Sequence, residues 1–400
     1  MNYTPQEVIQ YVDEENIQFI RLSFCDLNGR MKNIAVMPWE LPRIFSDGAA
    51  IDASAIAGFG GDIYSDMFLH PDPSTLSSLP WRAEHGGAVR MFCDIAHPDG
   101  TPFEGDCRRI LKKAISAATE AGYSFAFGAE MEFYLFKTDE YGNPTKIPWD
   151  NACYMDAAPH DRGENIRREI CLTLAQMGIL PESSHHEEGP GQNEIDFRYA
   201  EPLSSADNAI TFRNVVEIIT AHNGLWADFS PKPLANHPGN GLHINLSVQG
   251  QGDPLPNAIA GILHHVRDMS VFLNPTENSY ARLGQQKAPK YISWSSENRS
   301  QLIRVPAARG PYRRAELRSP DPTTNLYLSY ALLIYASLDG IQQNHYLPTP
   351  ANYNLFTAPP EILAQFQKLP ESLQEAKKLA AQSTFLHTHL PASVLDYYCR

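Results

Sequence analysis

The chain lacks the features that mark membrane and secreted proteins. No apolar run in its 400 residues approaches the roughly 18 residues that a membrane-spanning helix needs, so we expect no membrane partner. The first seven residues contain neither the basic region nor the apolar core of a signal peptide. These two absences together predict a cytoplasmic protein.

Cysteine and positive charge are also scarce. The six cysteines are scattered, and none forms a CxxC pair or another metal-binding spacing. This pattern favours a reducing compartment over a disulfide framework. Lysine and arginine number 32 against 46 aspartates and glutamates, which gives a net charge of −14. A nucleic-acid-binding protein is more often basic, so we expect no nucleic-acid partner.

The length and composition indicate a globular protein with two domains. The apolar content is 43% and the charged content is 20%, while 400 residues exceed a comfortable single core. Residues 97–102 contain two prolines and a glycine and form the best linker in the chain. We therefore place the domain boundary at residue 102, with domains at 1–102 and 103–400.

The first domain begins with a strong helix signal. Thr4 is a good N-cap, Pro5 occupies the first turn, and Glu7 completes a capping box, so a helix to about Glu15 is expected. Alternating apolar residues predict strands at 17–24, 33–37 and 89–95, the first two joined by a tight turn at 26–29. Residues 45–80 are expected to be rich in loops.

The second domain has a mixed α and β pattern. Apolar periodicity predicts helices at 107–121, 164–177 and 206–221, with two more near 257–272 and 324–339. Strands are expected at 125–136, 194–198 and 242–248.

The most informative feature is a pair of glutamates in the densest of these strands. Glu130 and Glu132 lie among aromatic and aliphatic residues, and alternation along a strand points both side chains to one face. Two like charges so close in apolar surroundings are costly unless something compensates them. A shared proton, arginines or divalent cations are the three possible compensations.

Three further segments carry unusual chemistry. The first runs from His185 and His186 through two glutamates and three turn residues to Glu194. The second, 239–243, is a glycine-rich turn that delivers His243 to a strand. The third places six arginines within twenty residues around a single glutamate: Arg299, Arg304, Arg309, Arg313, Arg314, Glu316 and Arg318.

Together these segments predict metal-assisted chemistry on a phosphate-bearing substrate. Arginine forks suit carboxylates and phosphates, and glutamate with histidine suits Mg²⁺ or Mn²⁺. Each segment alone also has an ordinary explanation: a solvated strand face, a surface loop, a hydrogen-bonded core histidine, or a salt-bridge network. The order and spacing of all four segments decide between the functional and the ordinary explanations.

On these segments the chain resembles the glutamine synthetase family over nearly its whole length. Matching motifs occur in order at 26–30, 65–67, 130–132, 186–194, 231–233, 298–300, 304–306, 316–318 and 320–322. The resemblance implies an α+β protein with a small β-grasp-like N-terminal domain. A large catalytic domain with an antiparallel sheet and flanking helices is expected to follow. It also implies a homo-oligomer of stacked hexameric rings, with each active site between one subunit's N-terminal domain and its neighbour's catalytic domain.

The resemblance also implies roles for individual residues. Two or more Mg²⁺ or Mn²⁺ ions are expected, one held by Glu132, Glu187 and Glu194 and another by Glu130, His243 and Glu316. Nucleotide contacts are expected from Glu182, Tyr199, Ser247 and Arg314, and substrate contacts from Tyr154, Gly239, Arg282 and Arg318. Arg299 and Arg304 are expected to face the transferred phosphoryl group, and Asp52 to deprotonate the incoming amine.

The implied reaction is an ATP-dependent ligation in two steps. ATP phosphorylates a glutamate-like carboxylate, and an amine then displaces phosphate from the acyl phosphate to give an amide. In this chemistry metal ions and arginines screen the repulsion between the carboxylate and the phosphates.

One departure from the family pattern concerns the amine. Lys287 stands where the family carries a flap glutamate that helps to bind ammonium and shields the acyl phosphate. At about 4 Å and an effective dielectric constant of about 20, such a charge contact is worth about 4 kcal/mol before screening. Ala55, Pro238 and Asn245 also differ from the usual residues near the ammonium, amino-acid and nucleotide sites.

The sequence therefore predicts a γ-glutamyl-amide ligase whose amine is not ammonia. Lys287 is expected to pair with a carboxylate on the acceptor, which would make the acceptor an amino acid or a similar anion. Two alternatives stay open. One is a true glutamine synthetase whose flap is rebuilt with Gln285 or Gln286, and the other is a non-catalytic relative with an assembly or regulatory role.

Overall fold

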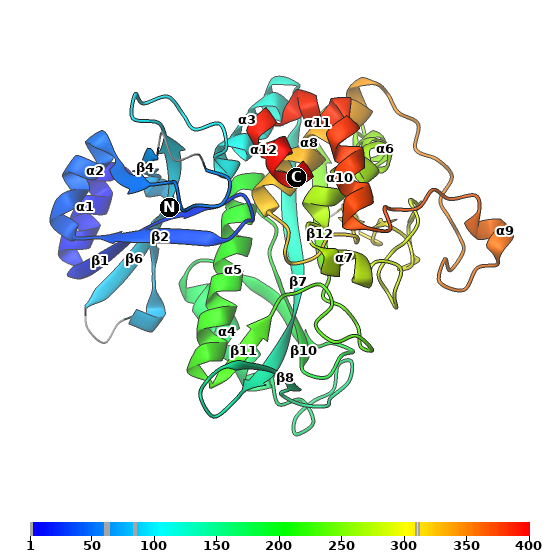
Figure 1. The fold of residues 1–400 in the computed structure, drawn as a ribbon, viewed down its shortest axis with the longest axis horizontal. Helices are drawn as coiled ribbons and strands as arrows, with labels where there is room; N and C mark the ends of the chain where they lie inside the picture. The colour runs from blue at the N-terminus through cyan, green and yellow to red at the C-terminus, as the bar shows by residue number, and fades with distance from the viewer. Residues whose placement is uncertain (1–2, 60–64, 83–85, 309, 311–312) are drawn as a thin grey trace.

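The computed structural model describes residues 3–59, 65–82, 86–308, 310 and 313–400. Figure 1 shows a small N-terminal domain beside a larger domain that contains the C-terminus. Among the described helices, none combines the length and the apolar character that crossing a membrane requires.

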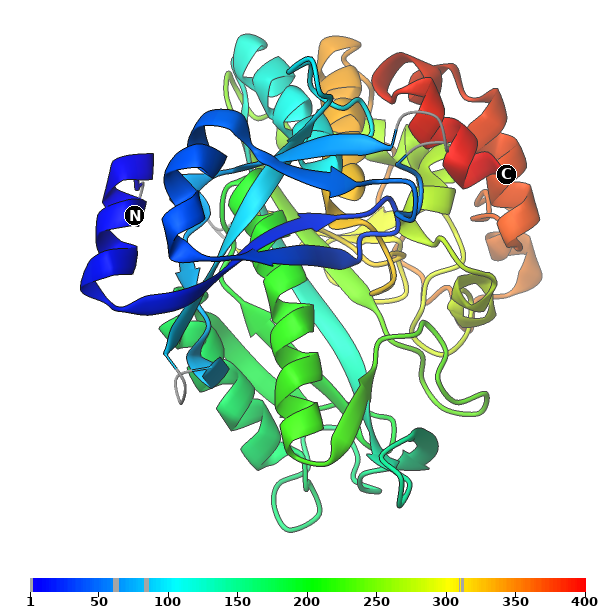
Figure 2. The ribbon, with the colours of Figure 1, turned by 60° about the vertical axis from the view of Figure 1, so that its left-hand side comes forward.

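The small domain is built on a six-stranded sheet with the order β2-β1-β6-β4-β3, to which β5 adds by pairing with β6. Strands β1 and β6 are parallel, and the other pairs are antiparallel. In both views its helices α1 and α2 lie on the side away from the large domain (Figure 1, Figure 2). Its elements are α1 Pro5–Glu14, β1 Ile17–Cys25, β2 Met31–Val36, η1 Pro38–Glu40, α2 Leu41–Asp47, β3 Ala49–Asp52, β4 Asp66–Pro71, η2 Pro73–Thr75, β5 Ser77–Ser78, η3 Pro80–Arg82 and β6 Gly87–Ala96.

The predicted start of the chain is confirmed. Thr4 accepts from the backbone N–H of Glu7, and the Glu7 carboxylate accepts from the backbone N–H of Thr4 at 2.7 Å, so both halves of the capping box are present. The prediction that residues 45–80 are rich in loops left out the short strands of this segment. Strands β3 and β4 lie there, and they are too short and too rich in flanking glycine and proline for alternation to reveal them.

The large domain has a nine-stranded sheet with the order β13-β14-β15-β12-β7-β10-β9, and β8 and β11 also pair with β7. Apart from the short parallel β13–β14 pair, the described pairings are antiparallel. Its strands are β7 Ser124–Thr138, β8 Pro144–Pro148, β9 Pro181–His186, β10 Gln192–Phe197, β11 Leu225–Asp228, β12 Leu242–Gln249, β13 Trp294–Ser295, β14 Ile303–Arg304 and β15 Ala315–Leu317.

The helices of the large domain match the five predicted ones and add several near the C-terminus. They are α3 Cys107–Glu120, α4 Glu164–Gln176, α5 Pro202–His222, α6 Leu255–Leu273, α7 Glu277–Arg282, α8 Leu326–Gln342, α9 Pro360–Leu363, α10 Leu373–Gln382, α11 Thr384–His389 and α12 Ala392–Cys399. The predicted α+β class with a small and a large domain is confirmed, while the boundary at residue 102 stays a prediction.

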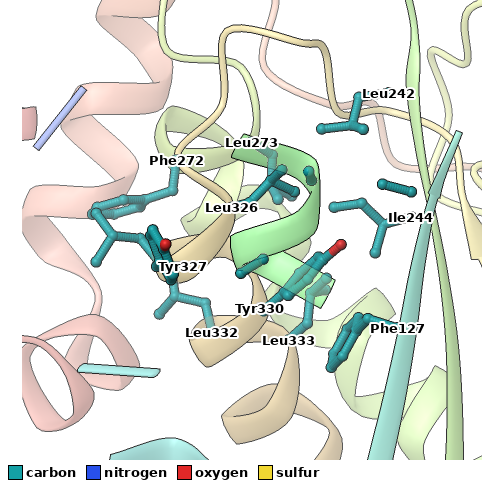
Figure 3. Packing of buried hydrophobic residues seen from close by; sticks show 14 of the residues in the cluster. Phe127, Leu242, Ile244, Phe272, Leu273, Leu326, Tyr327, Tyr330, Leu332 and Leu333 are labelled. Carbon is teal, nitrogen blue, oxygen red and sulfur yellow. The ribbon is translucent and has the colours of Figure 1, made fainter. Parts of the chain in front are cut away.

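The long strand β7 separates the core from a polar face. Its odd-numbered residues from Phe125 to Leu135 are buried in the hydrophobic core of the large domain. Figure 3 shows how this face packs: Phe127 of β7 lies against α8, with its ring stacked on that of Tyr330 at 4.2 Å between centroids. The even-numbered residues, including Glu130 and Glu132, point to the opposite face.

A buried cluster of charges joins the two domains. Arg108 of α3 is 4% exposed and lies 2.9 Å from a carboxylate oxygen of Asp72 and 3.1 Å from one of Asp94, both in the small domain. It also contacts Asp207 of α5 at 3.0 Å, and Asp207 accepts from the Tyr327 hydroxyl at 2.6 Å. Arg108 therefore fixes the small sheet to the helices that carry the large domain.

We predict that Asp207→Ala lowers the free energy of unfolding by about 3–5 kcal/mol, because it leaves Arg108 and Tyr327 buried without this partner. The half-exposed Lys112–Asp94 pair, 2.6 Å apart, provides a matched control, and Lys112→Ala is expected to cost at most about 1 kcal/mol. Urea denaturation of both variants measures the difference. Equal losses would contradict the assigned role of the Arg108 cluster.

Candidate active site

The polar face of the large sheet carries a continuous row of acidic and basic side chains. In the strand register, Glu130 of β7 lies opposite His243 of β12 and Asp196 of β10. Glu132 lies opposite Glu194, one pleat further along the same strands. Antiparallel pairing places such opposed side chains next to each other, so four carboxylates meet on one face.

One group of potential ligand atoms lies between β7, β12 and β15. One ligand atom each from Glu130, His243 and Glu316 lies within 4.8 Å of the others. The Nδ1 atom of His243 is 3.3 Å from a Glu130 carboxylate oxygen and 3.8 Å from one of Glu316. Burial disfavours the charged form of Glu130, but hydrogen bonds with His243 and Asn245 outweigh it and lower its pKa to about 2.

A second group lies between β9 and β10. His185, Glu187 and Glu194 also offer ligand atoms within 4.8 Å of one another. Glu132, the predicted third ligand of this set, instead accepts from the backbone N–H of Gly241 at 2.8 Å and from the Gln192 amide at 3.0 Å. The structure thus brings His185 into this group and places Glu132 beside it.

The carboxylates at this second group are compensated unequally. Burial disfavours the charged form of Glu187, but its contact with His185 outweighs burial and lowers its pKa, whereas Glu194 and the neighbouring Glu132 are poorly compensated. Burial, together with repulsion from Glu132 and Asp196, raises the pKa of Glu194 well above its ordinary value. Burial also raises the pKa of Glu132, and the nearby Glu187 adds to the effect. Oxygen-rich sites of this kind with one histidine fit hard divalent cations, whose charge would remove the repulsion.

A buried network holds the turn that carries Glu187. His186, which is fully buried, lies with Nε2 2.9 Å from a carboxylate oxygen of Asp150 and with Nδ1 2.6 Å from the carbonyl oxygen of Glu187. The same Asp150 oxygen accepts from the backbone N–H of Gly191 at 3.0 Å. Both ends of the turn between β9 and β10 are therefore tied to one carboxylate.

The arginine-rich segment borders the same face. Arg304 and Arg318 both contact the buried Glu316, the first at 2.7 Å. Arg314 donates from Nε to the Asn245 side-chain oxygen at 2.9 Å, while Asn245 donates to Glu130 at 2.7 Å. Arg299 is exposed, and Arg309 lies outside the described residues.

Two adjoining cavities open over this face. The larger, of about 690 Å³, is lined by all six predicted metal ligands, by Arg299, Arg304 and Arg314, and by the four predicted substrate residues Tyr154, Gly239, Arg282 and Arg318. The smaller, of about 250 Å³, is lined by the four predicted nucleotide residues Glu182, Tyr199, Ser247 and Arg314. Glu130, Ser183, Asp196 and Arg314 line both cavities and mark where they meet.

The predicted substrate residues differ in how tightly they are held. Arg282 is buried and donates to the carbonyl oxygens of Ser319 at 2.8 Å and Arg318 at 3.2 Å. Arg318 is also buried, and its Nε atom has no hydrogen-bond partner among the described residues. Gly239 permits close packing, since a Cβ atom there would lie 2.3 Å from the carbonyl oxygen of Pro231.

Lys287 also lines the larger cavity. Its Nζ atom is 2.5 Å from a carboxylate oxygen of Glu188 and 5.3 Å from the centre of the Tyr154 ring. The lysine therefore has a partner within the protein, on the turn that follows Glu187.

Asp52 is not brought to these cavities within one chain. It is exposed at the end of β3 in the small domain and accepts from the backbone N–H of Ser54 at 2.9 Å. Asp52 is not among the described residues that line either cavity.

Sequence reasoning missed Asp196 altogether, and it named His185 and Asn245 without the roles that the structure gives them. Asp196, whose pKa is raised by burial and by Glu130, shares a potential ligand group with Glu130 and Glu194. The same alternation that paired Glu130 with Glu132 would have found it, because Asp196 follows Glu194 by two positions on a strand. His185 and the bridging role of Asn245 depend on strand register, which the sequence does not reveal.

Comparison with known proteins identifies the architecture. The glutamine synthetase beta-grasp domain matches residues 16–98, and the glutamine synthetase catalytic domain matches residues 104–400. The chain belongs to the glutamine synthetase family. It is therefore an ATP-dependent ligase that forms C–N bonds, and its family uses ATP and divalent metal ions.

Full-length relatives support this assignment. The chain is 42% identical to glutamine synthetase of Clostridium saccharobutylicum over 391 residues, which cover 94% of this chain and 88% of the relative. It is also 42% identical to that of Methanosarcina mazei over 412 residues, covering 99% and 92%. The solved GmaS/ADP complex, conformation 1, is 27% identical with a TM-score of 0.89, covering 100% of this chain and 94% of that one.

At this glutamine synthetase-family site, we predict that Glu194 lowers the stability of the metal-free protein but contributes to metal binding. Since the pKa of Glu194 is raised in the folded protein, its ionised form destabilises the fold at neutral pH. Glu194→Gln is therefore expected to stabilise the metal-free protein and to reduce the stabilisation by Mg²⁺ or Mn²⁺.

Thermal unfolding with EDTA and with added metal measures both effects. Glu361→Gln on the exposed side of α9 is a control that should change neither. A Glu194→Gln protein that is less stable without metal and still gains the full metal shift would show that Glu194 is not part of a cation site.

Proposed function

We propose that this ligase joins a glutamate-like side-chain carboxylate to an amine other than ammonia, through an acyl phosphate. The observation that carries the proposal is that Lys287 lines the larger cavity at the position where the family is expected to carry a glutamate, so a carboxylate that would hold an ammonium ion is missing there. The likeness to the GmaS/ADP complex supports nucleotide binding in the same fold.

Glu132, Glu187 and Glu194 would hold one divalent ion, Mg²⁺ or Mn²⁺, and Glu130, His243 and Glu316 a second. When bound, such ions supply charge neutralisation and Lewis acidity at the phosphates. The close contacts of Glu130 with His243, and the repulsion around Glu194, support this division into two sites.

The smaller cavity suits the nucleotide. Glu182 and Ser247 offer acceptors and a hydroxyl at its wall, Tyr199 offers an exposed ring for stacking, and Arg314 stands where the two cavities meet. A nucleotide lying along this path would carry its phosphates into the larger cavity. Its terminal phosphate would then face Arg299 and Arg304.

The larger cavity suits the carboxylate substrate and the chemistry. Arg318, whose Nε has no hydrogen-bond partner among the described residues, and Arg282 would bind the substrate, with the Gly239 backbone and Tyr154 beside them. A side-chain carboxylate oxygen attacks the γ-phosphorus, ADP leaves, and Arg299 and Arg304 stabilise the charge on the transferred group. The amine nitrogen then attacks the acyl carbon, and phosphate leaves.

The second candidate is glutamine synthesis with ammonia. The relatives at 42% identity that bear the name glutamine synthetase favour it. Gln285 and Gln286 both line the cavity and would then take over the part of the missing flap glutamate.

We predict that at least one larger primary amine exceeds ammonia in kcat/KM by about tenfold or more, the range that one added methylene group commonly gives. Amide formation and ADP release measured across a panel of alkylamines, amino alcohols and amino acids provide the test. Reactions without amine give the background of ATP hydrolysis. Ammonia outperforming every other amine would overturn the proposal in favour of the second candidate.

The position of Asp52 supports a site completed by a neighbouring subunit. An exposed aspartate on the small domain cannot act on the amine in its own cavity, but a second copy of the chain in a ring would bring one there. We propose stacked hexameric rings in which Asp52 of each subunit accepts the amine proton in the cavity of the next.

This arrangement predicts complementation between two inactive variants. Asp52→Asn and Arg299→Ala, both at exposed positions, are each expected to lose about 10²-fold or more in kcat. After unfolding and co-refolding at equal amounts, about a quarter of the sites would join an intact cavity to an intact aspartate. Recovery of about that activity supports a shared site, and no recovery in assembled mixtures contradicts it.

A further inference from the structure

The Lys287–Glu188 ion pair joins two segments that lie far apart in the sequence. Lys287 belongs to the loop of residues 283–288, which follows α7, and Glu188 belongs to the turn between β9 and β10. The Lys287 and Glu188 side chains are 57% and 35% exposed, so the pair lies at the mouth of the larger cavity and not at its floor.

The 283–288 loop is anchored firmly at its start. Arg282, the last residue of α7, is buried and bonded to two carbonyl oxygens. Two turns follow, closed by hydrogen bonds from Gln285 to Arg282 at 3.0 Å and from Ala288 to Gln285 at 3.0 Å. Gln286 has a positive φ of 52°, a left-handed conformation that is uncommon for residues other than glycine.

Lys287 adds an attachment at the far end of this loop. Its ammonium group contacts both Glu188 and the ring of Tyr154. That ring meets His185 edge-on at 5.4 Å, and Nε2 of His185 is 3.0 Å from a carboxylate oxygen of Glu187. The loop is thereby connected through side chains to one of the predicted metal ligands.

Glu188 makes the second connection to the same ligand. Its backbone N–H donates to the other carboxylate oxygen of Glu187 at 3.1 Å. A loop held by Glu188 is therefore held by the residue that also orients Glu187. The lysine charge is already matched by Glu188, so an acceptor carboxylate is not needed to neutralise it.

We infer that Lys287 is a positioning residue that fastens the 283–288 loop to Glu188 and so closes the cavity over the acyl phosphate. This inference rests on the proposed acyl-phosphate chemistry, but not on which amine attacks. Closure excludes water from the reactive acyl carbon, so that the amine and not water displaces phosphate. The Lys287–Glu188 ion pair would thus take the role that is expected of the family's flap glutamate.

The test is a charge-reversal cycle with Lys287→Glu, Glu188→Lys and the double variant. Each single variant is expected to raise KM for the amine, and the fraction of ATP hydrolysed without amide formation, by about fivefold or more, or about 1 kcal/mol. The double variant restores the pair with reversed charges and is expected to return both quantities to within about twofold of the wild type.

Lys290→Glu is the matched control. Lys290 pairs with Glu371 at 3.4 Å, just beyond the 283–288 loop, and its reversal should change neither quantity. If a reversed-charge variant fails to fold, Lys287→Gln and Glu188→Gln carry the same expectation, with effects that do not add in the double variant.

Two results would overturn the inference. Single variants with wild-type coupling of ATP hydrolysis to amide formation would show that the pair does not close the cavity. Loss confined to acceptors that carry a carboxylate, without rescue in the double variant, would show that Lys287 binds the acceptor directly. Because the coupling is measured on whichever amine reacts best, a preference for ammonia would refute the proposed acceptor and leave this test intact.

Discussion

The crowding of buried carboxylates on one face of the large sheet is the constraint on which the rest of the site depends. Alternation along β7 places Glu130 and Glu132 side by side, and antiparallel pairing adds Asp196 and Glu194 directly opposite. The opposite face of the same strand is apolar and packs against α8, so the strand cannot turn over to expose its charges. The fold therefore fixes this negative charge, and its chemistry must use or neutralise it.

The compensation differs from one carboxylate to the next. His243 and Asn245 stabilise the charged form of Glu130, and Arg304 and Arg318 surround Glu316. At Glu194, burial and the charges of Glu132 and Asp196 dominate instead, and they raise its pKa. A shared proton between Glu130 and Glu132 does not fit, because the two carboxylates take their hydrogen bonds from different donors. Glu130 accepts from Asn245, and Glu132 accepts from the Gly241 backbone and from the Gln192 amide. Divalent cations at the proposed sites would complete the balance, which fits a family that uses divalent metal ions.

Local patterns in the sequence predicted much of this structure. The remaining features depend on strand register and on contacts between distant segments, which local patterns do not reveal. The Thr4 capping box and the apolar alternation of β7 are encoded within a few residues, and both are observed. Nearly all of the site residues that the order of the family motifs predicted line the two adjoining cavities. The Lys287–Glu188 contact could not be predicted, because it depends on how two distant loops approach each other. Asp52 could not be placed either, since a single chain leaves it outside the cavity.

Anomalous diffraction from crystals grown with Mn²⁺ and a non-hydrolysable ATP analogue tests the central claim most directly. The account predicts two separate manganese peaks on the polar face of β7. One would lie about 2.1 Å from oxygens of Glu130 and Glu316, and the other at a similar distance from oxygens of Glu187 and Glu194. A single peak bridging Glu130 and Glu132, or none near either, would contradict it.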